Sequence, residues 1–219
     1  MMVFFHSGGP VMYPLLACSF IVMTVIVERS VFWIKTGLQR NRPLVNTVLE
    51  LCRDGDWEAV RLRTAGCRDF VVRILVSGIL HREFSMLKAM EAAAADEAQR
   101  MRRYMGVLDT MITVAPLLGI FGTVTGIITS FEMLGSAGIA HPETVTAGVA
   151  EALITTASGL AIAIFSVFPY NFFNAKVERA ALEMEKYATS LEIVYEKLQH
   201  KENGARTAVG PVLPGACHR

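Results

Sequence analysis

The Lys and Arg residues of this 219-residue chain are confined to two stretches of the sequence. Residues 1–27 contain no Asp, Glu, Lys or Arg, and residues 110–175 contain three acids and no base. Fourteen of the 21 basic residues lie in 28–109 and the other seven in 176–219. Together with a mean hydropathy of +0.41, this distribution is typical of a membrane protein whose polar segments lie on one side of the bilayer.

Three segments are apolar enough to cross a bilayer, which takes about 20 residues. We therefore predict an all-α membrane protein with three transmembrane helices, the second and third extended into a cytoplasmic helical bundle. The predicted spans are residues 10–34, 110–134 and 145–173. Phe70–Leu80 is apolar but too short to span, and we interpret it as a buried helix face of the bundle rather than as a re-entrant segment.

The positive-inside rule orients these spans. It places the basic segment 35–109 and a helix over 174–201 in the cytoplasm, with the chain as a multi-pass membrane protein. The N-terminal residues 1–9 and the link 135–144 are then outside, which in a bacterium means the periplasm. Residues 202–219 are rich in Gly and Pro and are predicted to be disordered. From about Ser85 the sequence consists of good helix formers, which predicts one continuous helix into the second span.

The sequence lacks the common enzyme signatures: there is no Walker A loop, no GxSxG, no HExxH and no dinucleotide fingerprint. The four cysteines form no CxxC pair, and no His spacing suits zinc. No basic cluster is concentrated enough for nucleic acid. We therefore predict that the chain is not an enzyme, needs no cofactor or metal, and has the lipid bilayer but no nucleic acid as a partner.

The second span carries small residues on one face. Ala115, Gly119, Gly122 and Gly126 form a single stripe at about 100° per residue, with Thr123 on its flank. Small residues allow close helix packing in lipid, so we predict a packing role for these glycines. The Thr123 hydroxyl has two open interpretations: a bond to its own i−4 carbonyl, or a functional contact.

The third span contains an acid with no Lys or Arg within twenty residues on either side, Glu151. Thr155 and Ser158 share its helix face, and Gly148 and Gly159 lie beside that face. A charge at the bilayer centre costs about 2.5–3.5 kcal/mol on insertion scales. The acid is therefore predicted to be protonated or to face a wet cavity, as a proton carrier would be. The alternative is an interfacial carboxylate that reaches the headgroups.

Two motifs resemble those of the MotA/TolQ/ExbB proton channel family, in its ExbB/TolQ-like branch. APLLGIFGTVTGI (115–127) is similar to the family's second-span motif and EALITTASGLAIAI (151–164) to its third-span motif. The resemblance implies a ring, understood as five copies, around a dimer of an ExbD/TolR-like single-span protein, with a TonB/TolA-like protein as a possible further partner. It implies a multi-pass protein of the bacterial inner membrane that is a proton-channel subunit of an energy-coupling complex and drives periplasmic or outer-membrane work.

Carried over by motif position, the family's proton-pathway residues correspond to Thr123, Glu151 and Thr156. Helix geometry instead groups Thr155 and Ser158 with Glu151, because Thr156 lies about 140° away around the helix. Which threonine faces the pore stays open at this point. Two other functions also stay open: a non-conducting membrane scaffold and a sodium-driven motor subunit.

Overall fold

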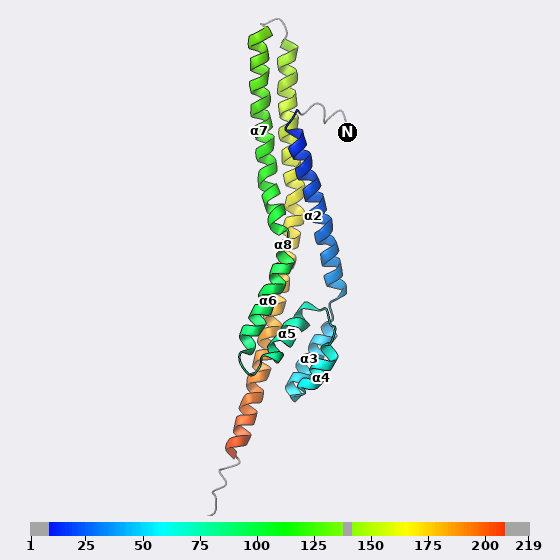
Figure 1. Cartoon of the computed structure of the whole chain (residues 1–219), viewed down its shortest axis with the longest axis vertical. Coiled ribbons are helices and arrows are strands. Elements are labelled where there is room, and N and C mark those ends of the chain that lie inside the picture. Colours follow the sequence, from blue (N-terminus) through cyan, green and yellow to red (C-terminus); the bar gives the residue numbers. More distant parts are fainter. Residues whose placement is uncertain (1–8, 138–141, 209–219) are drawn as a thin grey trace, which may run out of the picture. The chain divides into compact units, whose positions relative to one another are not determined.

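The computed structural model describes residues 9–137 and 142–208, and all regular structure within these ranges is helical (Figure 1). The chain divides into two compact units, residues 1–35 with 102–177 and residues 36–101 with 178–219. We call them the membrane unit and the polar unit. The helices are α2 (Met12–Leu38), α3 (Arg42–Asp54), α4 (Trp57–Thr64), α5 (Phe70–Leu80), α6 (Met86–Arg102), α7 (Met105–Ala137) and α8 (Pro142–Ala208).

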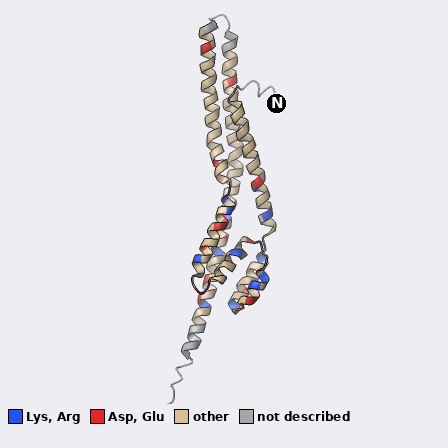
Figure 2. Ribbon diagram, viewed as in Figure 1, with Lys and Arg blue, Asp and Glu red and all other residues tan. Residues whose placement is uncertain are grey.

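Three helical segments of the described residues are long and apolar enough to cross a bilayer. They are α2, the α6–α7 segment and α8. This confirms the predicted all-α membrane protein with three transmembrane helices. Figure 2 shows no Lys or Arg along α7 or along the first part of α8. α8 continues as a helix to Ala208, past the boundary predicted at residue 201.

The membrane unit is held together by apolar side chains from all three of its helices. One buried cluster joins Val22 of α2, Leu108 of α7 and Phe173 of α8. A second joins Leu15 of α2 to Ala115 of α7. These contacts place the second and third spans directly against each other, with α2 packed on the pair.

The predicted continuous helix from Ser85 is interrupted at Arg103 and Tyr104. Tyr104 adopts a left-handed backbone conformation with φ of 64°, which costs a residue other than glycine about 1–3 kcal/mol. The Arg103 guanidinium lies 4.7 Å from the Tyr104 ring centroid, and the buried Arg29 guanidinium lies 5.6 Å from it. These cation–π contacts offset part of the strain, and they come from tertiary structure that helix propensity does not report.

The polar unit contains three short helices whose ends follow from local sequence. Pro43 lies in the first turn of α3, and Gly55 ends that helix with φ of 75°, a conformation that favours glycine. Asp56 accepts a hydrogen bond from the Ala59 N–H and so caps α4. α5 buries most of its apolar residues inside this unit, which agrees with the interpretation of Phe70–Leu80 as a buried face.

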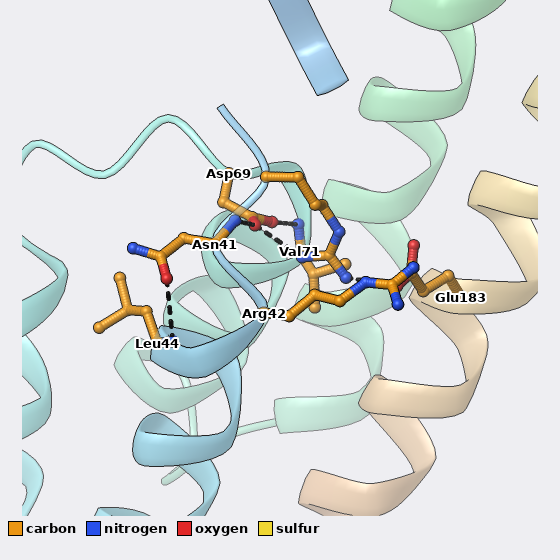
Figure 3. A network of polar contacts seen from close by, with 7 residues as sticks. Asn41, Arg42, Leu44, Asp69, Val71 and Glu183 are labelled. Atoms are coloured by element: carbon orange, nitrogen blue, oxygen red, sulfur yellow. Dashed lines mark hydrogen bonds and ion pairs between the residues drawn. The ribbon is translucent and has the colours of Figure 1, made fainter. Parts of the chain in front are cut away.

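An ion-pair network connects distant parts of the polar unit (Figure 3). Arg40 donates to Asp69 and to Glu183, both at 2.6 Å. The Asp69 carboxylate also accepts the backbone N–H groups of Asn41, at 2.7 Å, and Val71, at 2.9 Å. Burial lowers the pKa of Arg40, but its hydrogen bonds to Glu183 and Asp69 and the negative charges of these carboxylates together raise that pKa by more. The network therefore ties the segment after α2 to the start of α5 and to α8.

Candidate functional site

Glu151 lines a cavity of about 330 Å³ inside the membrane unit. Its side chain is half-buried, and the walls come from the start of α2, the second half of α7 and the first turns of α8. Four hydroxyl-bearing residues share these walls with the carboxyl group: Thr125, Thr129, Ser130 and Thr155. The cavity wall thus carries several polar groups, although most of its lining and the three helices around it are apolar.

No Lys or Arg lies near Glu151 along the two helices that form most of the cavity wall. α7 has no Lys or Arg, and the first base along α8 is Lys176. A carboxylate without a partner is costly in an apolar setting, whereas a protonated or hydrated carboxyl is tolerated. The cavity can hold water, because it is roomy and offers several polar groups as hydrogen-bond partners.

Thr155 is buried inside the chain, with only 1% of its surface exposed. Its methyl group lies against Gly122 of α7, and its hydroxyl donates to the Glu151 carbonyl oxygen at 3.1 Å. Ser158 is half-buried and donates to the Ile154 carbonyl oxygen at 2.8 Å. Both hydroxyls therefore satisfy carbonyl groups of their own helix, and only Thr155 lines the cavity.

Thr156 forms a second polar group with α7. Its hydroxyl donates to the Gly119 carbonyl oxygen at 2.9 Å and is hydrogen-bonded to the Thr123 hydroxyl. The Thr123 hydroxyl oxygen also lies 3.1 Å from the Gly119 carbonyl oxygen, and because it has a single proton it donates either to that carbonyl or to the Thr156 hydroxyl. The Thr123 hydroxyl therefore lies between a carbonyl oxygen of its own helix and a hydroxyl of the third span. This pair is half-buried and does not line the cavity that holds Glu151.

Small residues set the spacing between α7 and α8 at this site. A methyl group added to Gly119 would stand 3.0 Å from the Thr156 Cα, and one added to Gly126 would stand 2.9 Å from the Ala152 Cβ. An added methyl would overlap Thr155 at Gly122, Ser130 at Gly148 and the Ala115 carbonyl oxygen at Gly159. The two backbones thus approach closely enough for Thr156 to reach the Gly119 carbonyl oxygen.

Some cavity residues have no signal in the sequence pattern. Thr125, Thr129 and Ser130 lie on α7, and a hydroxyl that can bond to its own helix gives no hint of a cavity. Gly9 lies against the Glu151 side chain, although the two residues are 142 positions apart in the sequence. Glu132 of α7, by contrast, is exposed and outside this cavity.

The fold and the site define a class of protein: a multi-pass, all-helical membrane protein with an acid among hydroxyl groups between its spans. A model of the MotA/TolQ/ExbB proton channel family matches residues 69–186. The chain belongs to this family, whose members act in transport and energy coupling.

Its relatives confirm the ExbB/TolQ-like branch. The chain is 34% identical over 198 residues to the biopolymer transport protein ExbB-like 3 of Synechocystis sp., covering 87% of this chain and 93% of the relative. It is 35% identical over 113 residues to the Tol-Pal system protein TolQ of Pseudomonas aeruginosa, covering 52% and 49% of the two chains. The chain is accordingly an ExbB/TolQ-type energy-coupling subunit and a multi-pass inner-membrane protein.

Proposed function

We propose that this chain is a proton-conducting subunit of an inner-membrane complex of the ExbB–ExbD or TolQ–TolR type. Such a complex uses the proton-motive force to drive periplasmic or outer-membrane transport or related mechanical work. The observation that carries the proposal is the Glu151 carboxyl group in a cavity that four hydroxyl-bearing residues help to line, between apolar helices. A carboxyl group in such a place can take up and release a proton as its hydration changes.

In this proposal Glu151 is the titrating group, and the Thr123–Thr156 pair is the next polar station. Thr156 is half-buried whereas Thr155 is 1% exposed, which favours Thr156 as the threonine that meets a partner in the pore. Thr155 supports the Glu151 backbone through its hydrogen bond at 3.1 Å. Ser158 continues the polar face one turn further along α8.

The proposed assembly is a homo-oligomer, with a pentamer as the expected form, around a dimer of an ExbD/TolR-like single-span protein. A TonB/TolA-like protein is the proposed recipient of the work. The polar unit and the C-terminus are proposed to be cytoplasmic, with the N-terminus and the residues joining α7 to α8 periplasmic. Each proton that crosses supplies about 2.3 kcal/mol per 100 mV. Native mass spectrometry of the purified complex would test the ring of five.

The test is Glu151→Gln, which keeps the shape of the side chain and removes its titration. Cells that depend on the complex should lose all activity that is sensitive to an uncoupler. Glu132→Gln is the matched control, since Glu132 is also an acid of the membrane unit but is exposed. Full activity in Glu151→Gln would contradict proton conduction and favour a non-conducting scaffold.

A sodium-driven motor would behave differently when ions are exchanged. At constant pH and membrane potential, replacing sodium with potassium should leave the activity of a proton-driven complex unchanged. A loss of activity in potassium that sodium restores would instead identify sodium as the coupling ion.

A further inference from the structure

Residues Gly9 to Val11 form a turn that opens α2. Gly9 has φ of 65°, in the left-handed region that favours glycine. The Met12 N–H donates to the Gly9 carbonyl oxygen at 3.2 Å, and the Tyr13 N–H donates to the Pro10 carbonyl oxygen at 3.3 Å. The turn is therefore fixed to the first turn of the helix.

The same turn lies directly on the Glu151 carboxyl group. A methyl group added to Gly9 would overlap Glu151 Oε1 and would stand 3.4 Å from Cδ and 3.9 Å from Cγ of that side chain. All three of these neighbours belong to Glu151, so the glycine backbone covers the end of this one side chain. Gly9, Pro10 and Val11 all line the cavity.

The turn also contacts the opposite wall of the cavity. Val11 is buried, and its Cβ would stand 3.4 Å from a methyl group added to Gly122 of α7. The turn thus touches α8 through Gly9 and α7 through Val11. It closes the space between them on the side where α2 begins.

We propose that Gly9 is a positioning residue for Glu151, and that the Gly9–Val11 turn limits access to the carboxyl group. Two requirements coincide at this position: the left-handed backbone and the absence of a Cβ atom where Glu151 Oε1 lies. Glycine alone meets both. The functional meaning rests on the proposed role of Glu151 in proton conduction, but the positioning itself can be measured without any proton flow.

The measurement is the rate at which dicyclohexylcarbodiimide labels Glu151 in the purified full-length chain, followed by mass spectrometry across a range of pH. This reagent adds to a protonated carboxyl group in an apolar setting. In Gly9→Ala the new methyl group must displace the turn or the carboxyl group, so labelling should become faster by about fivefold or more. Labelling that is unchanged or slower at every pH would overturn the proposal.

Gly55→Ala is the matched control for backbone strain. Gly55 has φ of 75°, and a methyl group added there meets nothing within 4 Å. This variant carries the same kind of strain without a contact to the site, so its labelling rate should equal that of the unmodified chain. A similar acceleration in Gly55→Ala would show that strain alone changes the labelling, and would overturn the proposal.

A second variant applies if Gly9→Ala does not accumulate in the membrane. Gly9→Ala/Glu151→Asp shortens the carboxyl side chain by one methylene and leaves room for the new methyl group, so accumulation should return. Failure of the double variant to accumulate would assign the defect to the backbone and contradict a contact with Glu151.

Different results would contradict proton conduction by Glu151 and its positioning by Gly9. Full coupled activity of Glu151→Gln would remove the proposed function and leave the labelling result as it stands. Unchanged labelling in Gly9→Ala, together with an inactive Glu151→Gln, would remove the positioning role alone.

Discussion

Arg40 offers the most quantitative prediction for the stability of the polar unit. Arg40→Met keeps much of the side chain's length but removes its hydrogen bonds to Asp69 and Glu183, both at 2.6 Å. The Asp69 side chain is 0% exposed and that of Glu183 is 26% exposed, so the loss falls mainly on Asp69. Leaving one member of a buried ion pair without its partner costs about 3–5 kcal/mol.

The lower end of that range applies here, because Asp69 keeps two backbone N–H donors. A loss of about 3 kcal/mol should lower the melting temperature by about 6–12 °C for a chain of this size. Thermal unfolding of the detergent-solubilised chain, followed by circular dichroism, measures this shift. Arg40→Met/Asp69→Asn should recover about half of it, since the second change removes the buried charge that lost its partner.

Arg42→Met is the matched control for this experiment. Arg42 is 3.9 Å from Glu183, and its side chain is 74% exposed, so its removal should change stability by less than about 0.5 kcal/mol. Equal melting temperatures for Arg40→Met and Arg42→Met would refute the reasoning. So would a double variant that is less stable than Arg40→Met.

Three further predictions concern packing, the threonine pair and a buried thiol. Gly159→Ala should destabilise the chain by about 1–3 kcal/mol in thermal unfolding, because its methyl group meets the Ala115 carbonyl oxygen, whereas Gly106→Ala meets nothing within 4 Å and should be far milder. Thr156→Val should lower proton-driven activity while costing about 1 kcal/mol of stability, and an unchanged activity would exclude Thr156 from the route. Burial raises the pKa of Cys52 to about 12 from 9.0. Iodoacetamide at pH 9 should therefore spare Cys52 and modify the half-buried Cys67, as measured by mass spectrometry. Equal modification of the two thiols would contradict this prediction. Because its pKa is raised, the contribution of Cys52 to stability is complete below about pH 9 and is lost as the pH rises toward about 12.

The membrane-spanning helices were predictable because a bilayer imposes length and hydropathy on each span. The end of α3 was predictable as well, since Gly55 favours the left-handed conformation that stops a helix. The break before α7 was not, because nothing local marks Tyr104. Its left-handed backbone is accompanied by cation–π contacts from Arg29 and Arg103, and the first of these lies 75 positions away in sequence.

The candidate site also has features that could be predicted from the sequence and features that could not. The sequence points to Glu151 because an isolated acid in an apolar run is conspicuous. It leaves Thr155 and Thr156 unresolved, because helix geometry gives angles around α8 but not the position of α7. The structure separates them: Thr155 lines the cavity with Glu151, and Thr156 bonds to Thr123 and Gly119. The contact between Gly9 and Glu151 has no local signature, since it depends on how α2 packs against α8.

The proposed function requires that Glu151 carries protons across the membrane. This can be measured as proton flux into proteoliposomes that contain the chain and its single-span partner, with an internal pH-sensitive dye and an imposed membrane potential. The unmodified complex and Glu132→Gln should acidify the lumen at the same rate, and Glu151→Gln should fall to the rate of protein-free vesicles. Flux in Glu151→Gln equal to that of the unmodified complex would contradict the claim.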